Sequence, residues 1–305
     1  MSGTRTVALK VDVCTHDGMR DGVPRLLALL SERRVKASFF LSFGPDNSGK
    51  AVKNLLRPGF LKKMVRSSAP SMYGLRTMLS GTLLPARPIA AGHPDLVRRI
   101  AGEGHEVAVH AWDHRRWQDH LEEMDETEIE AQFEAAFAEF ETILGHAPRA
   151  VGAAAWIVTP RSLRVQDSLD LDYAGDLRGG PPCRLRAEGR VMRTPQIPTT
   201  GRCIEELLTT GLRGEEDLAR ALLSDLSGSD PAVLAVHAEV EGGPFGGVLN
   251  RMLDGFAERG DRVCTLAEIA GGLPRTELAV RELAYVELPG RSGKVATAAR
   301  PEEAP

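Results

Sequence analysis

Two histidines four residues apart, His110 and His114, stand at the end of a stretch in which apolar and polar side chains alternate. The alternation over residues 104–110 predicts a strand that brings His110 to the end of a sheet. If the chain becomes helical there, both imidazoles lie on one face and can bind a single metal ion. Because this spacing is common in proteins, a packed histidine next to a surface histidine is the alternative interpretation.

Two further strands are predicted to end in side chains suited to acid–base chemistry. Asp12 lies near the end of an apolar strand over residues 7–13, and His237 follows the apolar run 232–236. A buried carboxylate is costly unless something uses it, and α/β folds bind ligands beyond the carboxyl ends of their strands. We therefore expect Asp12, His110 and His237 to meet at one end of the sheet. A histidine at a strand end can also simply bind a carbonyl group.

The elements that must position these groups alternate between strands and helices, which predicts a parallel α/β sheet. We predict strands over residues 7–13, 35–42, 104–110, 150–158, 171–175, 188–197, 232–240 and 262–266, and helices over residues 24–34, 95–104, 122–144, 215–226 and 249–259. The alternation continues without a break in composition, so we expect a single domain over residues 1–288. Residues 289–305 are rich in Gly, Ser, Ala, Pro and charge, which predicts a disordered tail.

Composition limits the classes of protein that the chain can belong to. It has 305 residues, a net charge of -4 and the four cysteines Cys14, Cys183, Cys203 and Cys264. The net charge argues against a dedicated nucleic-acid-binding protein. The cysteines contain no C-x-x-C pair, which predicts neither a disulfide framework nor a structural zinc site. The first residues lead into a strand, and no apolar run is long enough to span a bilayer, so we expect a cytoplasmic protein.

Residues 45–94 interrupt the pattern with a basic insertion that we expect to be helical. Between Asn47 and Pro94 there are eight Lys or Arg residues and no Asp or Glu, with apolar residues between them. Basic side chains beside an apolar face are typical of an amphipathic segment on an anionic membrane. Alternatively, the insertion packs its apolar face on the sheet and exposes its charges. The lack of acidic residues favours contact with a membrane or an anionic substrate.

Several of these residues lie in motifs that resemble the polysaccharide deacetylase (NodB-homology) family. Residues 104–114 resemble its metal-binding motif, residues 10–13 its first motif and residues 236–237 its last. One branch, the deformylases of undecaprenyl-phosphate-linked 4-formamido-arabinose, is similar over further stretches, namely residues 22–27, 43–47, 110–114, 196–198 and 237–242, and in the basic insertion near residues 73–74. The resemblance extends over residues 6–285.

The resemblance implies a distorted (β/α) barrel and a hydrolase that uses a divalent metal ion such as zinc, cobalt or manganese. The implied reaction removes a formyl or acetyl group from the amide nitrogen of an amino sugar, which in this branch is lipid-linked and belongs to lipid A modification. The implied residues are Asp12 as general base, His237 as general acid, Asp176 as an acid that orients a catalytic partner, His110 and His114 as metal ligands, and Trp112, Arg178 and Glu239 in substrate binding.

One departure from the family pattern concerns the third metal ligand. The first motif of the family usually supplies a second aspartate for this purpose, and this chain has Cys14 there. A thiolate binds zinc well, so Cys14 is our candidate third ligand, with a preference for softer metals over manganese. The alternatives are Asp17, His16 or a water molecule as the ligand, or a small core cysteine at a weak or inactive site.

A second departure is Ile157, which stands where the family usually has an arginine that steadies the base. Arg161 and Arg178 are the candidates to compensate for it. Three functions follow: a hydrolase of a lipid-linked amino sugar at the inner face of the cytoplasmic membrane, a deacetylase of a soluble N-acyl sugar, or a catalytically weak glycolipid-binding pseudoenzyme on the same fold. Only Cys14 and Ile157 support the third function.

Overall fold

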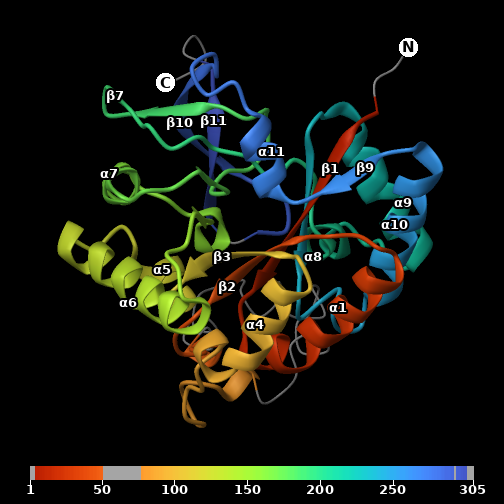
Figure 1. Ribbon diagram of the computed structural model, residues 1–305, viewed down its shortest axis with the longest axis horizontal. Helices are drawn as coiled ribbons and strands as arrows, with labels where there is room; N and C mark the ends of the chain where they lie inside the picture. Colours follow the sequence, from red (N-terminus) through yellow and green to blue (C-terminus); the bar gives the residue numbers. More distant parts are fainter. Residues whose placement is uncertain (1–3, 51–76, 292, 301–305) are drawn as a thin grey trace.

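The computed structural model describes residues 4–50, 77–291 and 293–300 (Figure 1). The strands are β1 (Thr6–Val13), β2 (Ser38–Ser42), β3 (Glu106–Ala111), β4 (Ala150–Val151), β5 (Tyr173–Ala174), β6 (Arg184–Ala187), β7 (Arg190–Val191), β8 (Ala232–His237), β9 (Arg262–Cys264), β10 (Val280–Glu287) and β11 (Lys294–Ala299). The helices are α1 (Val23–Glu32), α4 (Pro94–Gly102), α5 (His114–His120), α6 (Glu126–Leu144), α7 (Pro160–Ser168), α8 (Ile204–Thr209), α9 (Glu215–Asp225), α10 (Gly246–Arg259) and α11 (Leu266–Gly272). No helix within these ranges is long and apolar enough to cross a membrane.

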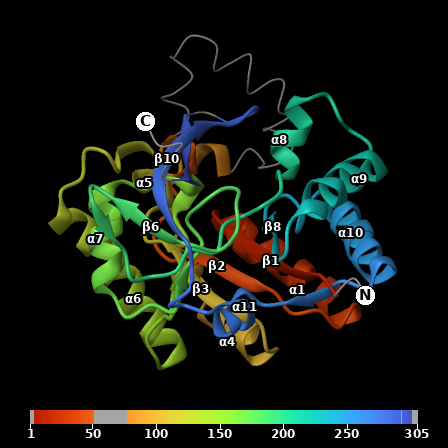
Figure 2. The same ribbon diagram turned by 90° about the horizontal axis from the view of Figure 1, so that it is seen from above.

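β1 lies between β2 and β8 in a parallel sheet with the strand order β5-β4-β3-β2-β1-β8, and β9 also pairs with the first residues of β1. The gap between β5 and β8 is bridged by an irregular segment, residues 196–200. In this segment the N–H of Ile197 donates to Ala174 (2.9 Å) and the N–H of Thr200 donates to Val233 (3.0 Å). Helices surround the curved sheet (Figure 2). The expected α/β fold of the distorted-barrel type is confirmed.

Side chains alternate along β1, because successive residues of a strand point to opposite faces of a sheet. Val7 and Leu9 belong to the large apolar core that also includes residues of the helices. Ala8 faces the other way and belongs to a second, smaller core. Lys10 and Asp12 continue this inner face toward the carboxyl end of the strand, and both are buried. The interior of the barrel therefore changes from apolar to charged along one strand.

The longest helix, α6, shows why the predicted helices form. Asp125 caps it by accepting a hydrogen bond from the N–H of Glu128 (2.8 Å), and Gly145 ends it in the left-handed conformation with φ of 78°. Both are residue types that favour these positions. Ile129 and Phe140 are buried on the face that packs into the core. The predicted helix over residues 122–144 is thus confirmed, with a start at residue 126.

A smaller sheet with the order β11-β10-β6-β7 includes β11, the last strand within the described residues. The prediction of a disordered tail over residues 289–305 is therefore wrong for residues 294–299, which form β11 and pair antiparallel with β10. Composition indicated disorder, but Val295 and Ala296 are 3% and 0% exposed, and this burial together with the strand pairing orders the segment. Residues 301–305 lie outside the described residues.

Two other predicted segments have different outcomes. The strand predicted over residues 150–158 ends at Val151, because the chain then makes a turn in which Ala155 and Trp156 both have φ of 55°. Most of the predicted basic insertion, residues 51–76, lies outside the described residues. Its last basic residue, Arg87, is described.

Candidate active site

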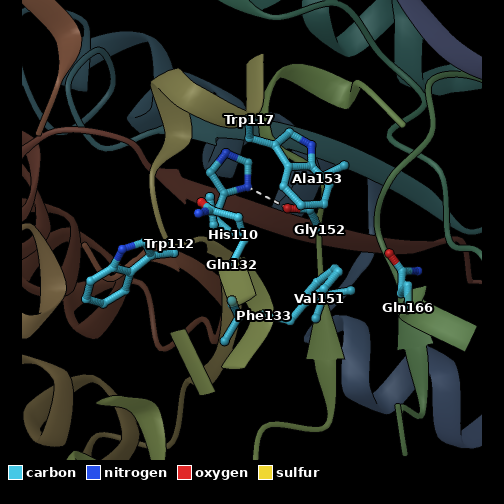
Figure 3. Close-up of a pocket in the computed structure, with 11 residues that line it drawn as sticks. His110, Trp112, Trp117, Gln132, Phe133, Val151, Gly152, Ala153 and Gln166 are labelled. Carbon is cyan, nitrogen blue, oxygen red and sulfur yellow. Dashed lines mark hydrogen bonds between the residues drawn. The ribbon is translucent and has the colours of Figure 1, made fainter. Parts of the chain in front are cut away.

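His110, near the end of β3, has its tautomer fixed by a backbone contact. Its Nδ1 atom lies 2.8 Å from the carbonyl oxygen of Gly152 (Figure 3). Because a carbonyl group can only accept a hydrogen bond, Nδ1 carries the proton and Nε2 keeps its lone pair. This is the arrangement in which a histidine binds a metal ion through Nε2.

His110 and His114 do not lie on one helix, so the predicted reason for their proximity is wrong. A turn between a strand and a helix brings them together instead. β3 ends at Ala111, and His114 is the first residue of α5. The carboxylate of Asp113 caps this helix by accepting hydrogen bonds from the backbone N–H groups two and three residues ahead (3.1 and 3.0 Å). The strand-to-helix turn brings the ring centroids of His110 and His114 to 5.1 Å.

Cys14 is the third member of this group. One ligand atom from each of Cys14, His110 and His114 can be chosen such that all three lie within 4.8 Å of one another. The two alternative ligands have other partners: Nδ1 of His16 lies 2.8 Å from a backbone carbonyl oxygen, and the carboxylate of Asp17 binds two arginines. Among the described residues, geometry therefore favours Cys14 as the third ligand.

The protonation states of this cluster suit metal binding. Burial lowers the pKa of His110 to about 4 and lowers the pKa of His114 well below its ordinary value, so both imidazoles are neutral at neutral pH. Burial, followed by the negative charges of Glu239 and Asp12, raises the pKa of the Cys14 thiol. A metal ion that binds to the thiolate must displace this proton, so binding strengthens as the pH rises.

Asp12 forms a buried ion pair with Lys10, two residues earlier on the same face of β1. The ammonium of Lys10 also lies 4.5 Å from the centre of the Phe40 ring. Burial alone would raise the pKa of Asp12, but the positive charge of Lys10, with smaller effects of His110 and His237, outweighs it and the pKa is lowered. Asp12 is therefore a carboxylate inside the barrel, which is the form that a general base requires.

The pairing of Asp12 also answers the question raised by Ile157. Arg161 donates to a backbone carbonyl and Arg178 binds a different carboxylate, so neither of the two proposed arginines is the partner of Asp12. In the described part of the chain, that partner is Lys10. The charge that steadies the carboxylate comes from the same strand rather than from the turn after β4.

His237, at the end of β8, is paired with a carboxylate that sequence analysis did not identify. Its Nδ1 atom lies 3.1 Å from Oε1 of Glu205, the second residue of α8. Burial alone would lower the pKa of His237, but the charge of Glu205, followed by that of Asp12, raises it to about 9. His237 is therefore protonated at neutral pH, as a general acid must be. In the sheet it is the direct register partner of Asp12.

Glu239, predicted to bind substrate, holds the loop that carries Cys14. Its Oε1 atom accepts hydrogen bonds from the backbone N–H groups of Cys14 (2.9 Å) and Thr15 (2.7 Å) and from the Thr15 hydroxyl (2.9 Å). The other carboxylate oxygen is buried and makes no hydrogen bond within the described residues. A contact of Glu239 with substrate stays a prediction.

Two other predicted residues, Asp176 and Trp112, have different surroundings. Asp176 accepts hydrogen bonds from Gln166 (2.9 Å), Gln196 (2.8 Å) and the N–H of Ala153 (2.8 Å), and the described structure shows none to His237. It supports the turn after β4, and its role in orienting a catalytic partner stays a prediction. Trp112 is among the residues that line a small cavity beside His110 (Figure 3).

Lys10 and Glu205 are the residues that sequence reasoning missed. Lys10 could have been found, because residues two apart on a strand share a face and Asp12 needs a cation when it is buried. Glu205 gave no comparable signal. It lies on a short helix far from His237 in the sequence, and only the tertiary structure brings the two together.

Comparison with known proteins agrees with this geometry. Residues 2–174 match the family described as polysaccharide deacetylase. A protein of Shewanella sediminis named "Probable 4-deoxy-4-formamido-L-arabinose-phosphoundecaprenol deformylase" is 33% identical over 236 residues, which are 77% of this chain and 76% of that protein. A protein of the same name from Wigglesworthia glossinidia brevipalpis is 25% identical over 92% of this chain and 97% of its own length.

Solved structures share the fold. A candidate polysaccharide deacetylase from Mycobacterium smegmatis is similar with a TM-score of 0.64 at 19% identity, over 94% of this chain and 97% of that chain. A CE4 family pseudoenzyme from Bacillus anthracis is similar with a TM-score of 0.52 at 14% identity, over 88% and 66% of the two chains.

Together, these findings establish that the chain belongs to the polysaccharide deacetylase family. It is an enzyme that hydrolyses carbon–nitrogen amide bonds, of the deformylase and deacetylase type.

We expect His237 to titrate with a pKa of about 9 in the metal-free protein, measured from its imidazole resonances by NMR. Glu205→Gln removes the charge that raises this pKa, which should then fall to 6.5 or below. Because folding raises the pKa, the pair contributes stability that is complete below the ordinary pKa of histidine and is lost as the pH rises through about 9.

The control for this titration is Glu188→Gln, which removes a carboxylate at the surface. It should leave the titration of His237 unchanged. An unaltered pKa of His237 in Glu205→Gln would show that the two side chains are not paired.

Proposed function

We propose that the chain is a metal-dependent deformylase that removes the formyl group from 4-formamido-arabinose linked to undecaprenyl phosphate, as a step of lipid A modification. One observation carries the proposal: one end of the barrel brings a Cys–His–His cluster together with an ionised carboxylate, Asp12, and a protonated imidazole, His237. The two deformylase relatives are named for this substrate, which supports formyl over acetyl.

Cys14, His110 and His114 would hold the metal ion. One thiolate and two imidazoles form a donor set that suits zinc or cobalt better than manganese. Nδ1 of His110 is already engaged by Gly152, which leaves Nε2 for the ion. When bound, such an ion polarises the amide carbonyl and lowers the pKa of a water molecule.

Two charged pairs divide the proton transfers. Asp12, kept ionised by Lys10, takes a proton from the water that adds to the carbonyl carbon of the formamide. His237, kept protonated by Glu205, gives a proton to the sugar nitrogen as the carbon–nitrogen bond breaks. The products are formate and the free amino sugar.

The two other functions have less support. A non-catalytic glycolipid-binding protein was favoured by Cys14 and Ile157, but Cys14 lies beside both histidines and Lys10 takes the place of the missing arginine beside Asp12. A deacetylase of a soluble N-acyl sugar would use the same residues. Only a comparison of acyl groups and carriers separates it from the deformylase.

We further propose that the enzyme works as a peripheral protein at the inner face of the cytoplasmic membrane. The lipid carrier holds this substrate at a membrane surface. Eight basic and no acidic residues between Asn47 and Pro94 favour attraction to anionic lipid. Leu83, in the same region, is 81% exposed and offers an apolar contact.

Metal content tests the proposed ligands. The wild-type protein should bind about one equivalent of zinc or cobalt, and the cobalt form should show a thiolate-to-cobalt charge-transfer band in the near ultraviolet. Cys14→Ser should lose the band and bind metal at least about tenfold more weakly. Cys14→Asp should lose the band but keep the metal, with a shift in preference toward manganese. A band that persists in Cys14→Ser would exclude Cys14 as the ligand.

Release of formate tests the activity. The substrate is 4-formamido-arabinose joined through a phosphodiester to a short prenyl chain, and its N-acetyl analogue serves as the comparison. We expect faster hydrolysis of the formyl compound, and a loss in kcat of about 10²- to 10⁴-fold in Asp12→Asn and in His237→Gln. Asp172→Asn, a surface control, should behave as wild type. Equal rates in wild type and Asp12→Asn would refute the proposed base.

Sedimentation with vesicles tests the membrane contact. The protein should sediment with vesicles that contain anionic lipid and remain in solution with neutral ones, because basic residues near an anionic surface each contribute about 1 kcal/mol. Lys62→Glu with Lys63→Glu should weaken binding to anionic vesicles more than tenfold. Arg98→Glu with Arg99→Glu on α4 makes the same charge change elsewhere and should have little effect. Equal binding by both double variants would locate the contact outside the insertion.

A further inference from the structure

Trp156 lies between the candidate active site and two arginines. The edge-to-face contact between its indole and the imidazole of His237 has a centroid distance of 6.2 Å. The guanidinium groups of Arg178 and Arg291 lie over the indole ring, 4.6 and 4.2 Å from its centre. One indole therefore contacts both the proposed general acid and these two positive charges.

The backbone at Trp156 is held in an unfavourable conformation. Ala155 and Trp156 both have φ of 55°, a region that residues other than glycine rarely adopt, and bulky residues least of all. Such strain persists only where the surrounding structure imposes it, and it is concentrated at functional sites. The turn after β4 is thus conformationally strained, and this strained turn positions the indole.

Arg291 reaches Trp156 from the far end of the chain. Leu288, Pro289, Gly290 and Arg291 have the sequence of a type II turn, with φ of 88° at Gly290 and a hydrogen bond from the N–H of Arg291 to the carbonyl of Leu288 (3.1 Å). A Cβ at Gly290 would collide with the side chain of Thr209 on α8, so the turn packs closely against that helix. The turn connects β10 to β11.

The charges around Trp156 do not balance. Arg178 and Arg291 bind the same carboxylate, that of Glu206, which is 3% exposed. The neighbouring acid, Glu205, is already matched by His237. Lys10, 5.5 Å from the indole, is matched by Asp12. Among the described residues, two guanidinium groups therefore share one carboxylate in a largely buried place, which leaves an excess of one positive charge. Burial of an unmatched charge is costly unless a ligand supplies the opposite charge.

We propose that Arg291, placed on Trp156 beside Arg178, binds the phosphodiester that joins the amino sugar to its lipid carrier. This inference rests on the proposed function, because only a substrate with a phosphate group makes use of the excess charge. Guanidinium groups bind phosphate oxygens through charge-assisted hydrogen bonds, and the buried indole of Trp156 holds Arg178 and Arg291 next to His237. Arg291 lies on the same indole that contacts His237, which places it beside the candidate active site.

The test compares two substrates that differ in the phosphate alone. One is the short prenyl phosphodiester of 4-formamido-arabinose, and the other is the methyl glycoside of the same sugar. Arg291→Gln should lower kcat/KM for the phosphodiester by about 10- to 100-fold, as expected for the loss of a charge-assisted hydrogen bond, and change the methyl glycoside less than about twofold. Arg291→Lys, which keeps the charge, should recover part of the loss.

Arg186→Gln is the matched control, because it removes an arginine of the same small sheet that is paired with Glu282 at the surface. It should behave as wild type with both substrates. An equal loss on both substrates in Arg291→Gln, or no loss on either, would overturn the proposal while leaving the deformylase assignment intact.

A binding measurement keeps the two proposals separate if neither substrate is hydrolysed. Methyl geranyl phosphate, which has no sugar, is titrated into the metal-loaded wild-type protein and into Arg291→Gln by calorimetry. Binding to wild type that is at least tenfold weaker in the variant supports the phosphate site even though the deformylase assignment has failed. Equal affinity, or no binding to wild type, overturns the phosphate site.

Discussion

The buried ion pair between Lys10 and Asp12 is the constraint on which the site depends. An ionised carboxylate inside a barrel is tolerated only with a compensating charge, and one strand supplies both groups on the same face. Because β1 has neighbours on both sides, its position fixes Asp12 against His237 on β8. The same strand leads directly to Cys14. The proposed base, the proposed acid and the candidate metal cluster are thus all positioned by one strand, β1.

Each of the two charges that we propose to act in catalysis has one structural partner of the opposite sign. Lys10 holds Asp12 in its basic form, and Glu205 holds His237 in its acidic form. The pKa of the carboxylate is lowered and the pKa of the imidazole is raised. At the same neutral pH the carboxylate is therefore ionised and the imidazole is protonated. This difference between the two pKa values follows from the pairing of buried charged groups.

Sequence analysis located most of the candidate site, because strand ends in a parallel sheet are a predictable place for chemistry. Asp12, His110 and His237 were found in this way, and Cys14 from its position in a motif. The helical interpretation of His110 and His114 was wrong, since a strand-to-helix turn also brings residues four apart together. Glu205 and Arg291 were missed because their partners are distant in the sequence. β11 was missed because the composition of residues 289–305 predicted disorder.

The position of β1 has a consequence for how the protein is made. β1 is synthesised long before its partner β8, and Glu239 lies 225 residues beyond Cys14, whose N–H group it binds. Contacts between such distant residues form late, because a long loop must close first. The amino-terminal half of the chain carries the proposed base and the three residues of the candidate metal cluster, but not the proposed general acid. A chain that ends before β8 therefore lacks both His237 and the carboxylate of Glu239, which holds the loop of Cys14.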